Sequence, residues 1–244
     1  MAELEEKLLR IFARLARENT SIRLLNTFKG YPVSNDASIL SVTQQGQIRI
    51  QTHKRQMLCL NFDHETLILG DAFPGYIKAR AEQIDMPNCQ ADLTRLQYIQ
   101  EKLVQRETAR VVPRESTPVW VTLKEKNFRI KCEIVDISLE GMGVWLPIEF
   151  FVPNRIRRGA EVLLAFELPI PGSAQTVEIR GEGTIRNTLG AAGYQQKRVG
   201  IRTHYERPHN YQISQYIQLR ILEIMREMDM TYNALTRLSQ ARTG

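Results

Sequence analysis

The sequence has few of the residues that bind metal ions or form disulfide bonds. It contains three cysteines and four histidines in 244 residues. The cysteines, Cys59, Cys89 and Cys132, are far apart and lack CxxC spacing. An odd number of scattered cysteines argues against a disulfide framework and against a zinc site, and it fits a reducing compartment. We therefore predict no metal site and no bound cofactor.

Long apolar runs are also missing from the chain. No stretch approaches the roughly 20 apolar residues that a membrane-spanning helix needs. The first residues, 1–7, are acidic and lack the basic start and apolar core of a secretory signal peptide. The sequence therefore predicts a cytoplasmic protein without a membrane span.

The motifs of common enzyme classes are absent as well. The sequence has no Gly-x-Ser-x-Gly, HExxH or P-loop motif and no paired Cys and His nucleophile arrangement. We therefore predict no catalytic residues and a protein that is not an enzyme. The net charge of +6 favours anionic partners such as a nucleotide, nucleic acid or a membrane surface, although plain solubility also explains it.

Two segments have the periodicity of amphipathic helices. Apolar residues recur at helical spacing over 4–15, with Glu and Arg on the opposite face. A second apolar stripe predicts a helix over 211–228. The last residues, 235–244, are polar and are expected to fray.

Strand-like patterns fill the chain between these helices. Short alternating stretches, separated by turn-prone residues, run over 22–91 and resume over 119–202. We count 57–62 among the strands, and we expect Trp120 and Trp145 in the core. Many short strands predict a mainly β fold with two small antiparallel β-barrels, joined by a charged linker and accompanied by an N-terminal and a C-terminal helix.

A charged segment broken by proline divides the two halves. It carries Arg106, Arg110 and Arg114 among glutamates, and Pro113 discourages a continuing helix. The predicted domains are an N-terminal helix with an accessory barrel over 1–100, the linker over 101–116, a second barrel with its helix over 117–230, and a polar tail over 231–244.

The motif with the clearest chemistry is Asp-x-Ser-x-x-Gly at Asp136, Ser138 and Gly141. Taken alone it is a turn, in which Asp and Ser cap backbone amides and Gly supplies a positive φ where one is needed. With the upstream arginines it suits a guanine dinucleotide. Arginine binds a phosphate or the O6/N7 edge of guanine, and a carboxylate accepts hydrogen bonds from the other edge. The alternative for the arginines is a solvated linker.

Arg-x-x-x-Arg, a strand pair and Asp-x-Ser-x-x-Gly, in this order, resemble the PilZ domain family. The resemblance covers 106–228 and extends to the stretch 198–202, which is similar to the closing strand of that family. The N-terminal half is similar to the accessory barrel of YcgR-type flagellar brake proteins. These proteins often carry a second adjacent arginine where this chain has Glu107.

The resemblance implies a set of residues that bind cyclic di-GMP. Arg106 and Arg110 are implied as the paired arginines, and Asp136, Ser138 and Gly141 as the second motif. Because Arg110 and Arg114 have the same spacing, they form an alternative register that stays open.

The implied function is that of a cyclic di-GMP receptor. It would change its domain arrangement on ligand binding and regulate a partner protein in motility, exopolysaccharide, biofilm or secretion control. One alternative is a PilZ-like protein–protein adapter without ligand binding. Another is a nucleic-acid-binding β-barrel, although no strand interleaves aromatic pairs with basic residues. The partner, the ligand affinity and stoichiometry, and the formation of a homodimer stay open.

Overall fold

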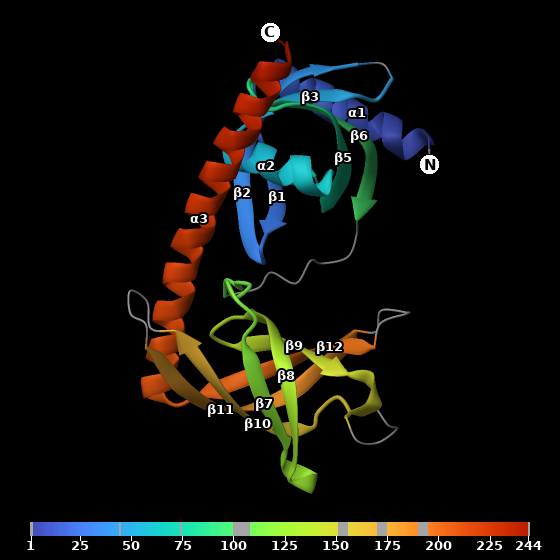
Figure 1. Cartoon of the computed structure of the whole chain (residues 1–244). Coiled ribbons are helices and arrows are strands. Elements are labelled where there is room, and N and C mark those ends of the chain that lie inside the picture. The colour runs from blue at the N-terminus through green and yellow to red at the C-terminus, as the bar shows by residue number, and fades with distance from the viewer. Residues whose placement is uncertain are drawn as a thin grey trace. The chain divides into compact units, whose positions relative to one another are not determined.

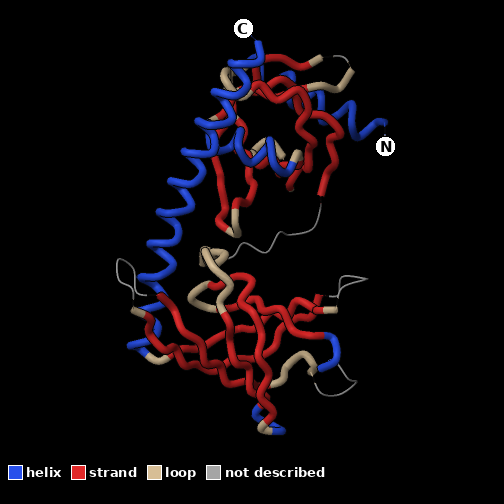
Figure 2. Tube along the Cα trace, in the orientation of Figure 1, coloured by secondary structure: helices blue, strands red, loops and turns tan. Residues whose placement is uncertain are grey.

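The structure is a computed structural model and describes residues 2–43, 45–73, 75–99, 108–150, 156–169, 175–189 and 195–243. The chain divides into two compact units. The first comprises residues 1–28, 32–105 and 224–244, and the second comprises residues 29–31 and 106–223. Each unit contains one closed antiparallel barrel (Figure 1), and strand dominates the described chain (Figure 2). The predicted mainly β fold with two barrels is confirmed.

The first barrel has the strand order β1-β2-β3-β6-β5-β4. Its strands are β1 (Ile22–Phe28), β2 (Tyr31–Val42), β3 (Ile48–Thr52), β4 (Glu65–Leu69), β5 (Tyr76–Asp85) and β6 (Gln90–Ile99). Buried and exposed residues alternate along β1 and along the first half of β5, as expected for strands with one face toward a core.

The N-terminal helix α1 (Ala2–Arg17) forms where the sequence predicts a helix. Leu8, Phe12 and Leu15 are buried, and the Phe12 ring lies 5.1 Å from that of Phe73, measured between ring centroids. These contacts make α1 a packing helix of the first unit.

The segment 57–62 is helix rather than strand, so that part of the sequence prediction is wrong. It belongs to α2 (Lys54–Asp63), which begins after the N-cap His53 and ends at His64 with a left-handed φ of 53°. Figure 1 shows α2 within the first barrel. Its residues 56–60 are all buried, and a short run that is apolar on every side has no period to distinguish a helix from a strand.

The second barrel has the strand order β10-β11-β12-β9-β8-β7. Its elements are β7 (Pro118–Leu123), the 3-10 turn η1 (Lys124–Lys126), β8 (Phe128–Ile137), β9 (Gly141–Pro147), the 3-10 turn η2 (Ile148–Phe150), β10 (Glu161–Pro169), β11 (Thr176–Leu189) and β12 (Gln196–Tyr205). Alternating burial along β8 and β10 directs one face of each strand into the barrel.

The two tryptophans of this barrel differ from the prediction that both lie in its core. Trp120 of β7 is 38% exposed, and Trp145 of β9 is only half-buried. Trp120 alternates with the buried Val119 and Val121, so the pleat of β7 places it on the outer face.

The C-terminal helix α3 (Arg207–Thr243) is longer than the predicted helix over 211–228. Residues 207–223 cluster with the second unit and residues 224–244 with the first. In the first unit Tyr232 is buried and donates from Oη to the carbonyl oxygen of Met86 over 2.6 Å. The residues that the sequence assigns to a polar, fraying tail are therefore helical as far as Thr243.

Candidate functional site

Asp136 lies near the end of β8, beside β9. The two strands pair with Asp136 opposite Gly143, and a bulge between Ile134 and Asp136 shifts their register. A Cβ atom at Gly143 would lie 3.0 Å from Oδ1 of Asp136, so the glycine leaves the space that the carboxylate occupies. The Asp136 side chain is only 7% exposed.

Ser138 and Gly141 close the turn between β8 and β9. The Ser138 amide donates to the carbonyl oxygen of Gly141 over 2.8 Å, and the Ser138 hydroxyl donates to the same oxygen over 3.0 Å. Gly141 is not among the described glycines with a positive φ, so the expected reason for this glycine is wrong. A Cβ atom there would lie 3.4 Å from Nη2 of Arg110 and 3.1 Å from the carbonyl oxygen of Ile201, so Gly141 makes room for Arg110.

Two arginines from different elements hold the carboxylate of Asp136. Arg110 donates from Nη1 to Oδ1 over 3.0 Å, and Arg198 of β12 donates from Nη2 to Oδ2. The segment that carries Arg110 is fixed to β8, because Val111 and Ile137 exchange two backbone hydrogen bonds of 3.0 Å. Arg110, which both registers of the arginine motif share, therefore meets the Asp-x-Ser-x-x-Gly motif in the folded chain.

We name Arg110, Asp136 and Arg198 the Asp136 cluster. Its buried carboxylate is compensated because both oxygens accept charge-assisted hydrogen bonds. The side chains of Arg110 and Arg198 are 26% and 35% exposed, so the accessible part of the cluster is cationic. A guanidinium group has five N–H donors, which leaves donors for a phosphate or for the O6/N7 edge of guanine.

The other predicted arginines are placed differently. Arg106 lies outside the described residues. Arg114 lines a pocket to which no member of the Asp136 cluster contributes. Val111 is fully buried and Pro113 is buried, so this end of the predicted linker has apolar anchors that its charged sequence obscures.

Arg198 belongs to the cluster, although it lies outside both sequence motifs. It lies 62 residues after Asp136. In β12 it precedes the buried Val199, as an outward-facing residue of any strand would. Only the strand order β12-β9-β8 brings it to Asp136. The resemblance of residues 198–202 to the closing strand of the PilZ family is the one sequence feature that includes Arg198.

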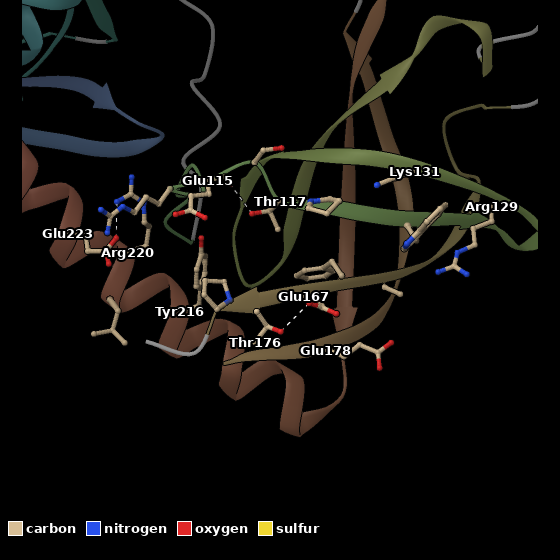
Figure 3. Close-up of a pocket in the computed structure, with 18 residues that line it drawn as sticks. Glu115, Thr117, Arg129, Lys131, Glu167, Thr176, Glu178, Tyr216, Arg220 and Glu223 are labelled. Carbon is tan, nitrogen blue, oxygen red and sulfur yellow. Dashed lines mark hydrogen bonds and ion pairs between the residues drawn. The ribbon is translucent and has the colours of Figure 1, made fainter. Parts of the chain in front are cut away.

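The pocket that Arg114 lines has a volume of about 700 Å³ and lies in the second unit (Figure 3). Its walls come from residues 114–118, from β7, β8, β10 and β11, and from α3. Figure 3 shows Tyr216 and Arg220 projecting from the helix at one end, and Arg129 and Lys131 at the other. No member of the Asp136 cluster lines it.

Neither buried thiol is poised for nucleophilic chemistry. Burial raises the pKa of Cys59 and of Cys132 to about 12, so the thiolate is scarce near neutral pH. Over the described residues, no three His, Cys, Asp or Glu side chains are grouped so that they could hold a metal ion. None of the described helices combines the length and the apolar character of a membrane span.

Comparison with known proteins gives one family match. The model of the PilZ domain matches residues 105–221, a range that contains both motifs and most of the second unit. No curated protein matches the chain significantly.

Several solved structures resemble the chain distantly. Bacillus subtilis MotI/DgrA, an inhibitor of motility, is 15% identical over 84% of this chain and 97% of its own, with a TM-score of 0.41. Escherichia coli YcgR in complex with cyclic di-GMP is 14% identical over 95% and 93%, with a TM-score of 0.39. The K. pneumonia MrkH–cyclic di-GMP complex is 16% identical over 91% and 96%, also with a TM-score of 0.39.

The assignment of the chain rests on the family match and on the motifs inside the matched range. Both barrels are closed and six-stranded, and Arg110 of the first motif contacts Asp136 of the second. The chain therefore carries a PilZ domain at residues 105–221.

Proposed function

We propose that the chain is a receptor that binds cyclic di-GMP at the Asp136 cluster. One observation carries this proposal: Arg110 of the first motif donates to Asp136 of the second motif over 3.0 Å. The match to the PilZ model over residues 105–221 supports it. A guanine dinucleotide with two phosphates needs guanidinium donors and a carboxylate acceptor side by side, and the cluster offers both.

Each residue of the motifs receives a role in the proposed complex. The carboxylate of Asp136 accepts hydrogen bonds from the N1–H and the exocyclic amino group of guanine. Arg110 turns from Asp136 toward a phosphate or the O6/N7 edge of the base. Ser138 and Gly141 keep the turn in shape, and the Ser138 hydroxyl keeps a lone pair for the ligand.

The second arginine of the pair is Arg106 in this proposal. Arg110 belongs to both registers, so the choice depends on whether Arg106 or Arg114 accompanies it. Arg114 lines the separate pocket, which favours the register of Arg106 and Arg110.

We infer that ligand binding also changes how the two predicted domains, 1–100 and 117–230, are arranged. Arg106 and Arg110 both lie in the predicted linker 101–116, so a ligand that pairs with them binds the linker itself. The output is a contact with a protein partner in the cytoplasm, in the control of motility, exopolysaccharide, biofilm or secretion.

Limited trypsin digestion tests the linker step. Cleavage after Lys102 and Arg106 should slow when cyclic di-GMP is saturating and stay unchanged with GTP. Equal cleavage rates in a sample shown to be saturated with cyclic di-GMP would contradict the linker step and leave ligand binding intact.

Thermal unfolding distinguishes the receptor from its alternatives. A ligand that binds only the folded chain stabilises it by RT ln(1 + c/Kd), where c is the free ligand concentration, so Tm rises with the logarithm of c once c is well above Kd. We expect cyclic di-GMP to raise Tm, and GTP and a single-stranded oligonucleotide to leave it unchanged. A rise with the oligonucleotide alone would favour a nucleic-acid-binding barrel, and no rise with cyclic di-GMP would favour a protein–protein adapter.

A further inference from the structure

The strands β7 and β10 separate at one end of the second barrel. Their pairing ends at Val119 and Phe166, whereas β10 continues to Pro169 and pairs there with β11 alone. The pocket of about 700 Å³ lies at this opening, with α3 as a further wall (Figure 3). Pockets of several hundred Å³ are large enough to bury a small ligand or a few side chains of a partner.

Two large apolar side chains are accessible in the pocket wall. Trp120 is 38% exposed and Leu219 is 39% exposed. Trp120 lies opposite Ala165 of β10, whose small side chain leaves that side of the indole uncovered, while the Arg129 guanidinium lies 4.2 Å from the indole centroid. Accessible tryptophan beside arginine is the chemistry of strong anchor points in protein interfaces.

The wall beside Trp120 also presents cations for a partner. Arg114, Arg129 and Lys131 are exposed, and no carboxylate forms an ion pair with any of them among the described residues. Lys131 is directly opposite Trp120 in the pairing of β8 and β7. Cations that no carboxylate pairs with are available to complement an acidic surface.

More of the pocket's carboxylates than of its cations have ion-pair or hydrogen-bond partners within the protein. Glu178 is paired with Arg180, and Glu223 with Arg220. Glu167 accepts a hydrogen bond from the Thr176 hydroxyl over 3.0 Å (Figure 3). Among the described carboxylates of the pocket, only the Glu115 side chain has neither an ion pair nor a hydrogen bond.

We propose that this pocket binds an extended acidic segment of a protein partner. A large apolar side chain of the segment packs on Trp120 and Leu219, and its carboxylates pair with Arg129 and Lys131. A nucleic acid fits less well, because the pocket offers a single accessible tryptophan on which bases could stack.

The segment 110–118 connects this pocket with the Asp136 cluster. From Arg110 it leads to Val112, whose carbonyl oxygen accepts from Nε of the buried Arg220 over 3.0 Å. It then reaches Arg114, which lines the pocket together with Tyr216, and Thr117, whose carbonyl oxygen accepts from the Ile134 amide over 2.9 Å. A ligand that withdraws Arg110 from Asp136 therefore acts on a segment that forms the pocket wall. This coupling rests on the proposed function.

A phage-displayed library of random linear peptides, selected on the full-length protein, tests the pocket. We expect enriched peptides to be acidic and to contain a large apolar residue. In fluorescence anisotropy, Trp120→Ala and Lys131→Glu should each weaken the best peptide roughly tenfold or more. Lys126→Glu is the matched control, since Lys126 is exposed on η1 and outside the pocket.

Three results would overturn the pocket proposal: no enrichment, unchanged peptide binding by the folded Trp120→Ala variant, or binding of a single-stranded oligonucleotide that Trp120→Ala abolishes. The coupling is tested on the same preparation with cyclic di-GMP. A several-fold change in peptide affinity supports it, and equal affinity with and without bound ligand overturns it. Absence of cyclic di-GMP binding refutes the proposed function instead, while the peptide result still decides the pocket.

Discussion

Asp136 and Arg198 form an ion pair across β9, from strands that are far apart in the sequence. Gly143 of β9 lies between their strands, opposite Asp136 on one side and opposite Gly200 of β12 on the other. The carboxylate of Asp136 fills the space beside Gly143, and the side chain of Asn187 fills the space beside Gly200. Because Arg198 is on a paired strand, it can keep Asp136 oriented when Arg110 turns toward a ligand.

Arg198→Met should therefore reduce the selectivity of the site as well as its affinity. In the proposed complex Asp136 recognises the amino group of guanine, which cyclic di-IMP lacks. We expect calorimetry to show weaker cyclic di-GMP binding in the variant and a smaller preference for cyclic di-GMP over cyclic di-IMP. Arg180→Met is the matched control, since Arg180 forms an exposed ion pair with Glu178. An equal loss for both dinucleotides would mean that Arg198 only supports the barrel.

Arg110→Ala and Asp136→Asn should each weaken cyclic di-GMP binding by about 1–3 kcal/mol, the range of a lost charge-assisted hydrogen bond. Calorimetric titration measures the loss, and circular dichroism confirms that the variants fold. Full affinity in a folded Asp136→Asn variant would show that the ligand binds at a site other than the Asp136 cluster.

The register of the arginine pair predicts opposite outcomes for two alanine variants. Arg106→Ala should weaken cyclic di-GMP binding, and Arg114→Ala should leave it close to the wild-type value, because Arg114 lines the other pocket. The same titration decides between them. A silent Arg106→Ala beside a damaging Arg114→Ala would establish the alternative register of Arg110 and Arg114.

The sequence was sufficient for the features that depend on local pattern. Alternating burial is encoded residue by residue, so both barrels and the helix α1 could be predicted. The fixed spacing of Asp136, Ser138 and Gly141 likewise identified the turn between β8 and β9.

Features that depend on tertiary packing could not be predicted in the same way. The apolar run of α2 has no period, because the barrel around it buries residues on every side. Arg198 reaches Asp136 only because the strand order places β12 next to β9. The helix α3 extends through Tyr232, whose hydroxyl donates a hydrogen bond to the carbonyl oxygen of Met86. Trp120 lies outside the barrel although tryptophan usually prefers burial.

A separate prediction concerns the stability of the first unit at acid pH. Asp229 of α3 accepts from Arg55 over 2.8 Å and lies 3.1 Å from Nζ of Lys54. The hydrogen bond from Arg55, followed by Lys54, lowers the pKa of Asp229 from 3.8 to about 2. Because the pKa is lower in the folded state, this stabilisation is present above about pH 4 and is lost as the pH falls toward 2.

Asp229→Asn should lower the free energy of unfolding by about 1 kcal/mol at neutral pH, a value reduced for the partial exposure of the pair. Urea unfolding at a series of pH values measures the difference from the wild type, which should shrink toward zero as Asp229 becomes protonated. A difference that is independent of pH would assign the effect to packing rather than to charge.

The most direct test of the central claim is calorimetric titration of the full-length protein with cyclic di-GMP, beside the Arg110→Ala/Asp136→Ala double variant. We predict saturable binding to the wild type and none to the folded double variant, with GTP inert toward both. A folded wild-type protein that takes up no cyclic di-GMP, or a double variant that binds it as tightly as the wild type, would contradict a receptor built on the Asp136 cluster.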